Sequence, residues 1–157
     1  MKNILLAVAL QRYRDFTPHA LAARQVAMDL ALFYKALIHA FTVEAKPLPL
    51  VPDADLETTE EKILRFIQPI KEAGIDVFHH ILEGTPRKLI THHAREVQAD
   101  LIVMGSHGKR TIMDVTLGGT AAAVLADAPC RVLLAAAPAD QHSRIKELIV
   151  PDRFLDF

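Results

Sequence analysis

The sequence lacks tryptophan, and its 157 residues include only two tyrosines and seven phenylalanines. With so few rings, the core must be built from Ala, Val, Leu and Ile, which suits a sheet covered by helices. A single cysteine, Cys130, excludes an intrachain disulfide. Because it precedes an apolar run, we predict that Cys130 is a small buried residue rather than a reactive thiol.

The chain also lacks an excess of charge of either sign. Its 18 Lys and Arg residues nearly balance its 19 Asp and Glu residues, for a formal net charge of -1. General nucleic-acid binding needs clustered basic residues, so we expect no nucleic-acid partner. A near-neutral net charge is still compatible with a local site for a small anion. The apolar run 4–10 is too short to cross a bilayer and has no signal-peptide cleavage pattern. We therefore expect a cytoplasmic protein with no membrane partner.

Strands and helices alternate along the chain. The continuous apolar run 4–9 is typical of a strand buried on both faces, as in parallel sheets. Further strands are predicted at 36–43, 75–82, 100–104 and 131–136, and helices at 18–34, from 53 to Gly74, at 86–97 and at 118–126. This order predicts one α/β domain over 1–140, an open doubly wound five-stranded parallel sheet with helices on both faces. Residues 141–157 then form a tail.

Helix boundaries are marked by threonine, proline and glycine. Thr17-Pro18 and Thr85-Pro86 each combine an N-cap residue with a proline at the first helical position. Pro69 predicts a kink or a break in hydrogen bonding, and Gly74 predicts the end of that helix. In doubly wound sheets ligands bind at the carboxyl ends of strands, where the winding direction reverses. The loops after the first and fourth strands are therefore the best candidates for a site.

A glycine-rich segment follows the fourth strand. Gly105 and Gly108 come after Met104, and Gly118-Gly119 opens the next helix. Glycine lets backbone N–H groups approach an anion, and a helix N-terminus adds unpaired donors. Lys109 and Arg110 add positive charge. The segment favours a phosphate site, with a purely structural turn as the alternative; it is neither a P-loop nor a dinucleotide fingerprint.

The spacing of these glycines resembles that of the universal stress protein family. Gly105, two residues, Gly108, nine residues and Gly118 match the family pattern, and Gly-Ser-His-Gly is a common opening. The family resemblance extends to three further segments, the flanking sequences at 99–104 and 126–133 and the Asp-Phe-Thr-Pro sequence at 15–18. The resemblance covers roughly residues 1–137 and implies the adenine-nucleotide alpha-hydrolase-like version of the Rossmann-like fold.

That resemblance implies a homodimer that binds ATP or AMP, with or without Mg²⁺, over the strand ends. The glycine loop would hold phosphates and ribose, and backbone near Val43 would meet adenine. The nucleotide-binding positions implied are Ala9, Asp15, Val43, Met104, Gly105, His107, Gly108, Arg110, Gly118, Gly119 and Thr120.

Two positions depart from the family pattern. Gly119 stands where the family has Ser or Thr, and Thr120 follows one place later. Nucleotide-binding members of the family carry an acidic residue just after the first strand. Counting residues from the end of that strand puts Ala9 at this position, whereas aligning the Asp-Phe-Thr-Pro sequence puts Asp15 there. We favour Asp15 slightly, because insertions in loops cost little free energy.

The remaining polar residues predict no metal and no catalytic centre. Among eight histidines, His79 and His80 point to opposite faces of a strand, and His92 and His93 point about 100° apart on a helix. We therefore interpret them as solvated. Ser106 and Thr120 have no His–Asp relay beside them, which disfavours nucleophilic catalysis.

Together with the resemblance, these observations predict a nucleotide-binding regulatory protein with an unidentified protein partner and no evident catalytic set. A nucleotide-free dimerisation or adaptor module is the main alternative, and slow ATP hydrolysis or phosphotransfer is a weaker one. Apolar residues in the tail, such as Leu148, Ile149, Val150 and Phe154, predict that it docks on its own domain or on a dimer partner.

Overall fold

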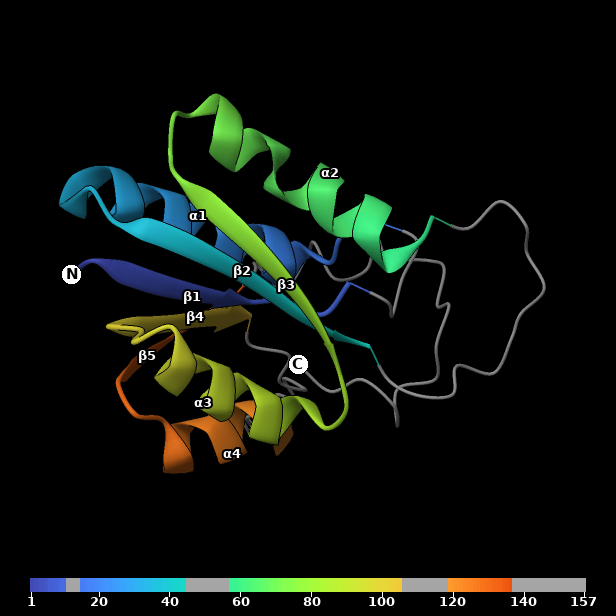
Figure 1. Cartoon of the computed structure of the whole chain (residues 1–157), viewed down its shortest axis with the longest axis vertical. Coiled ribbons are helices and arrows are strands. Elements are labelled where there is room, and N and C mark those ends of the chain that lie inside the picture. The colour runs from blue at the N-terminus through green and yellow to red at the C-terminus, as the bar shows by residue number, and fades with distance from the viewer. Residues whose placement is uncertain (11–14, 45–56, 106–118, 137–157) are drawn as a thin grey trace, which may run out of the picture.

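The computed structural model describes residues 1–10, 15–44, 57–105 and 119–136, in which five strands alternate with four helices (Figure 1). The elements are β1 (Asn3–Ala7), α1 (Pro18–Tyr34), β2 (Leu37–Glu44), α2 (Thr59–Glu72), β3 (Val77–Glu83), α3 (Pro86–Glu96), β4 (Leu101–Gly105), α4 (Gly119–Asp127) and β5 (Arg131–Ala135). Each strand predicted from the sequence is present, with its ends shifted by at most two residues.

The five strands form one parallel sheet in the order β3-β2-β1-β4-β5. In the central strand β1, Leu5 is in register with His39 on one side and Ile102 on the other. The chain runs outward from β1 to β3, then returns to β4 on the other side of β1. The winding thus reverses between β1 and β4, as predicted, and their carboxyl ends lie side by side.

Helices cover both faces of the sheet, with α1 and α2 on one face and α3 and α4 on the other (Figure 1). The α1/α2 face buries residues such as Ile4, Leu6 and Ile38, and the α3/α4 face buries Leu5 and Ile102. The continuous apolar run of β1 is explained, because neighbouring side chains enter opposite layers. No helix among the described residues has the length and apolarity to cross a bilayer.

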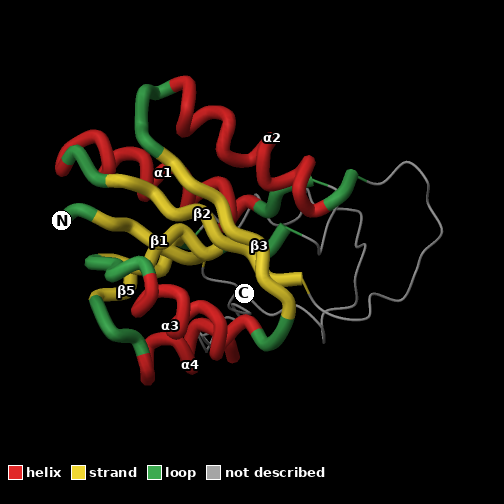
Figure 2. Tube along the Cα trace, in the orientation of Figure 1, coloured by secondary structure: helices red, strands yellow, loops and turns green. Residues whose placement is uncertain are grey.

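The cover over the edge strand β3 is uneven. Helix α2 packs on β3 and β2 from one side, whereas α3 packs on β2 from the other. Figure 2 shows α2 alongside the length of β3. Phe78 of β3, which is in register with His39, is 58% exposed. The α3/α4 side of β3 is therefore only partly covered.

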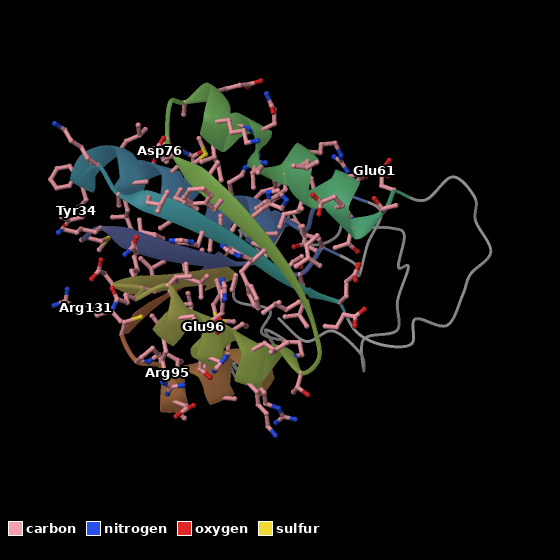
Figure 3. The ribbon with its side chains drawn as sticks, viewed as in Figure 1. Tyr34, Glu61, Asp76, Arg95, Glu96 and Arg131 are labelled. Carbon is pink, nitrogen blue, oxygen red and sulfur yellow. The ribbon has the colours of Figure 1, made fainter. Side chains whose placement is uncertain are left out.

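Helix α1 begins where Thr17-Pro18 predicts it, whereas α2 begins at Thr59 and not near residue 53. The Thr17 hydroxyl accepts a hydrogen bond from the N–H of Ala20 at 3.2 Å, and Pro18 begins α1. At α2, Thr58 and Glu61 form a reciprocal capping box, and Figure 3 labels Glu61 at that end. Thr85 precedes α3 but makes no side-chain capping bond.

The proline at position 69 does not end α2. The helix continues through Pro69 to Glu72, and Gly74 follows with a φ of +77°. Proline removes only its own N–H, and the final turn is closed by the N–H of Ala73 donating to the Pro69 carbonyl at 3.1 Å. The last turn also contains Ile70, and the full burial of this side chain stabilises the end of the helix.

Candidate functional site

The carboxyl ends of β1, β2 and β4 bring three of the predicted site residues together. Ala9, Val43 and Met104 all belong to the buried cluster on the α3/α4 side of the sheet. The N–H of Val8 donates to the Phe41 carbonyl at 2.9 Å, so backbone pairing between the first two strands extends past the end of β1. These three residues are therefore part of one buried apolar cluster at this edge of the sheet.

Gly105 closes β4 directly against the first turn of α1. A Cβ built on Gly105 would lie 2.6 Å from Cδ2 of His19 and 3.0 Å from the His19 carbonyl oxygen. Real Cβ contacts are not that short, so only glycine allows β4 and α1 to approach this closely. The glycine that the sequence singled out is therefore required by packing at the point where the winding reverses.

His19 is a residue of this region that the sequence reasoning did not single out. It is 3% exposed, it is the second residue of α1, and it contacts Gly105 at the end of β4. The available signal was its position, since it follows Thr17-Pro18 in the first helix after the first strand. The first turn after that strand faces the same edge as the glycine loop.

The two candidates for the acidic position lie on different sides of the sheet. Ala9 is in the α3/α4 cluster with Val43 and Met104. Asp15 is exposed and precedes Phe16, whose ring lies 5.0 Å from that of Phe66 on α2. The sequence slightly favoured Asp15, and the structure places the two residues in different surroundings.

The carboxyl group of Asp15 acts on Lys62, a residue that the sequence also did not single out. Lys62 is 5% exposed in the first turn of α2, and burial lowers the pKa of its ammonium group to about 8, while Glu57 and Asp15 act to raise it. An ammonium with this pKa is still mostly protonated at pH 7. A nearly buried cation therefore lies near Asp15 on the α1/α2 side.

The start of α4 supplies the last part of the predicted site. Helix α4 begins at Gly119, which is exposed, and Thr120 is 8% exposed. The first N–H groups of a helix have no acceptor within the helix, so this end can receive an anion. His107, Gly108, Arg110 and Gly118 lie outside the described residues, as does Ser106.

The interpretation of the histidines as solvated holds for the exposed His92 but is wrong for His93. His79 and His80 do point to opposite faces, and His79 lies 2.9 Å from Glu60 of α2. His93, however, is only 6% exposed, because its ring stacks on Phe41 beneath α3. No group of three or more His, Cys, Asp or Glu in the described part of the chain is arranged to hold a metal ion.

Cys130 is half-buried against the α3/α4 cluster rather than fully enclosed. Burial raises the pKa of its thiol, which lowers its thiolate fraction at neutral pH. This agrees with a packing role.

A model of the universal stress protein family matches residues 1–136 of this chain. The chain belongs to the universal stress protein family. A universal stress protein of Methanocaldococcus jannaschii is 30% identical over 134 residues, which is 79% of each chain.

Solved universal stress proteins have the same fold. One from Archaeoglobus fulgidus is 27% identical with a TM-score of 0.65, and the match covers 88% of this chain and 45% of that longer one. Another, from Arabidopsis thaliana with AMP bound, is 19% identical with a TM-score of 0.68, over 90% of this chain and 95% of that one. The fold class expected from the alternation of strands and helices is confirmed.

Proposed function

We propose that this universal stress protein binds an adenine nucleotide, ATP or AMP, at the carboxyl ends of β1, β2 and β4, and acts as a homodimeric regulatory protein. The packing of Gly105 against the first turn of α1 carries this proposal. It holds the start of the glycine loop at the place where doubly wound sheets bind ligands. The Arabidopsis relative with AMP supports the choice of nucleotide.

Each part of the proposed site has a distinct task. The buried apolar cluster that contains Ala9, Val43 and Met104 supports this edge of the sheet, and the backbone near Val43 would supply polar groups for adenine. The first turn of α4, from Gly119 and Thr120, supplies N–H donors for phosphate. His107, Gly108, Arg110 and Gly118 complete the proposed phosphate and ribose contacts. Mg²⁺, if it accompanies the nucleotide, would be held mainly by phosphate oxygens.

We propose further that Ala9, and not Asp15, occupies the position of the family's acid. Ala9 shares its cluster with Val43 and Met104, whereas Asp15 lies beside Lys62 on the α1/α2 side. Ala9→Asp should then strengthen nucleotide binding by supplying a carboxylate for ribose hydroxyls, and Asp15→Asn should change it little. Weaker binding in Asp15→Asn, with no gain in Ala9→Asp, would assign the acidic role to Asp15.

The alternative is a nucleotide-free dimerisation or adaptor module. Two observations favour it: Ala9 is apolar, and Gly119 carries no hydroxyl at the place where the family has one. The constrained Gly105, at the edge where doubly wound sheets bind ligands, favours the nucleotide.

Calorimetric titration of the full chain with ATP and with AMP, each with and without Mg²⁺, tests the proposal. We expect saturable binding that Gly108→Val abolishes and Gly74→Asn leaves intact. Gly74 is a suitable control because it lies in the turn after α2 with a φ of +77°, a conformation that Asn tolerates. Absence of binding up to millimolar nucleotide would leave the adaptor module, and turnover of ATP during the titration would identify slow hydrolysis.

A further inference from the structure

Three histidines that are far apart in the sequence meet on the partly covered face of the sheet. His39 of β2 is in register with Phe78 of β3, and Phe41 of β2 is in register with His80. Since residues in register share a face, His39 and His80 project on the same side of the sheet. Helix α3 packs on β2 from that side and contributes His93. We call these three residues the histidine cluster.

The imidazoles of the cluster are in direct contact. Nδ1 of His39 and Nε2 of His80 are 3.3 Å apart. Such a pair needs one N–H donor and one bare nitrogen acceptor, so it is broken when both rings are protonated. The His80 ring also meets the His93 ring edge-on, with centroids 4.4 Å apart. Two or three positive charges at these distances repel one another.

His93 is the member that connects the cluster to α3. Its ring lies flat on Phe41, with centroids 4.9 Å apart and an interplanar angle of 18°. Nδ1 lies 3.1 Å from a carboxylate oxygen of Glu96, to which it donates a hydrogen bond. Nε2 is buried without a hydrogen-bond partner among the described residues.

Carboxylates lie beside two elements of the cluster, and Glu96 is the one that contacts a cluster member among the described residues. On α3, Glu96 faces His93 and is shared with the exposed His92, whose Nε2 lies 3.3 Å from it; Figure 3 labels Glu96. From β3, His79 lies on the opposite face and pairs with Glu60 of α2.

From β1, the residue in register with His39 is the apolar Leu5. Burial first, and then His93, lower the pKa of His39. The pKa of His80 is lowered by burial and by the other histidines, while Glu96 only partly opposes that shift.

We propose that the histidine cluster makes the packing of α3 on the sheet sensitive to acid: the helix is held firmly while the imidazoles are neutral, and protonation of the cluster loosens it. The ordinary pKa of histidine, near 6.5, places this response in mildly acidic solution. The proposal concerns α3 alone and is independent of nucleotide binding.

The direction of the effect follows from proton linkage. The pKa values of His39 and His80 are lowered in the folded protein, so the unfolded chain binds more protons below about pH 6.5. Their contribution is therefore fully present above that pH and is lost as the pH falls toward the lowered folded-state values. Stability should decline with acidification, and α3 should open before the central strands do.

Hydrogen exchange of the full chain without nucleotide, at pH 7.5 and pH 5.5 and corrected for intrinsic rates, tests the proposal. We expect protection within 88–96 to fall at least threefold more than protection within 20–34 of α1. The double variant His39→Gln/His80→Gln should lose this difference, and His92→Gln, which alters an exposed histidine of the same helix, should keep it. Equal losses in α1 and α3, or an unchanged acid response in the double variant, would overturn the proposal.

A second measurement does not depend on a variant that might fail to fold. The histidine side chains of the unmodified protein can be titrated by NMR. We expect His39 and His80 to titrate at a lower pH than histidine in an unfolded chain, together with line broadening in α3 over the same pH range. Titration of both at the ordinary histidine pKa, with no change in α3, would also overturn the proposal.

Discussion

Gly105, at the end of β4, packs so closely on the first turn of α1 that no side chain fits between them. Gly105→Ala places a methyl group 2.6 Å from the His19 ring and 3.0 Å from its backbone oxygen. The ring can rotate, but the backbone oxygen belongs to a helix, so we expect a loss of about 1–3 kcal/mol in the free energy of unfolding, typical of an overpacked site. Urea denaturation measures it.

The matched control is Gly74→Asn. Gly74 has open space where a Cβ would lie, and Asn tolerates its positive φ. We expect its urea midpoint to stay close to that of the unmodified protein. If Gly105→Ala were as stable as this control, the close approach of α1 to β4 would have no energetic consequence.

At the scale of the element, three threonines precede helices but only two cap them. The hydroxyls of Thr17 and Thr58 accept backbone N–H groups, whereas that of Thr85 does not. We expect Thr58→Ala to lower the free energy of unfolding by about 1 kcal/mol, since it also breaks the capping box. Thr85→Ala, as the paired control, should lower it by only a few tenths of a kcal/mol. Equal effects in urea melts would contradict this assignment.

The elements also show how far the sequence could predict this fold. The strands followed from apolar runs, and the start of α1 followed from Thr17-Pro18, because these signals depend on neighbouring residues only. The sequence alone could not predict the histidine cluster, because its members lie in three different elements, β2, β3 and α3. It depends on the register that aligns His39 with Phe78, and that register is a contact between distant segments.

The nucleotide site itself stays a prediction. The reversal of winding pointed to the loops after the first and fourth strands, and the family resemblance added Ala9 and Val43. They could not show that His19 would press on Gly105, nor on which side of the sheet Asp15 would lie. Those facts arise from packing between α1, α2 and the sheet.

At the scale of the whole molecule, the tail and the homodimer stay predictions, since residues 137–157 lie outside the described part of the chain. Removal of residues 141–157 should change either the mass in solution or the melting temperature, because its apolar residues would otherwise be exposed. Sedimentation should show the full chain at twice the mass of one copy. A deletion that alters neither quantity would show that the tail does not dock.

The position of β1 in the middle of the sheet has a consequence for synthesis on the ribosome. Ile4 pairs with Ile38 early, but its other partner, Leu101, is made about 100 residues later, which takes roughly 5–20 s at ordinary translation speeds. For that interval the most apolar strand of the nascent chain has one open edge. Until β4 emerges, the growing protein should be a natural client for chaperones that shield unpaired strands.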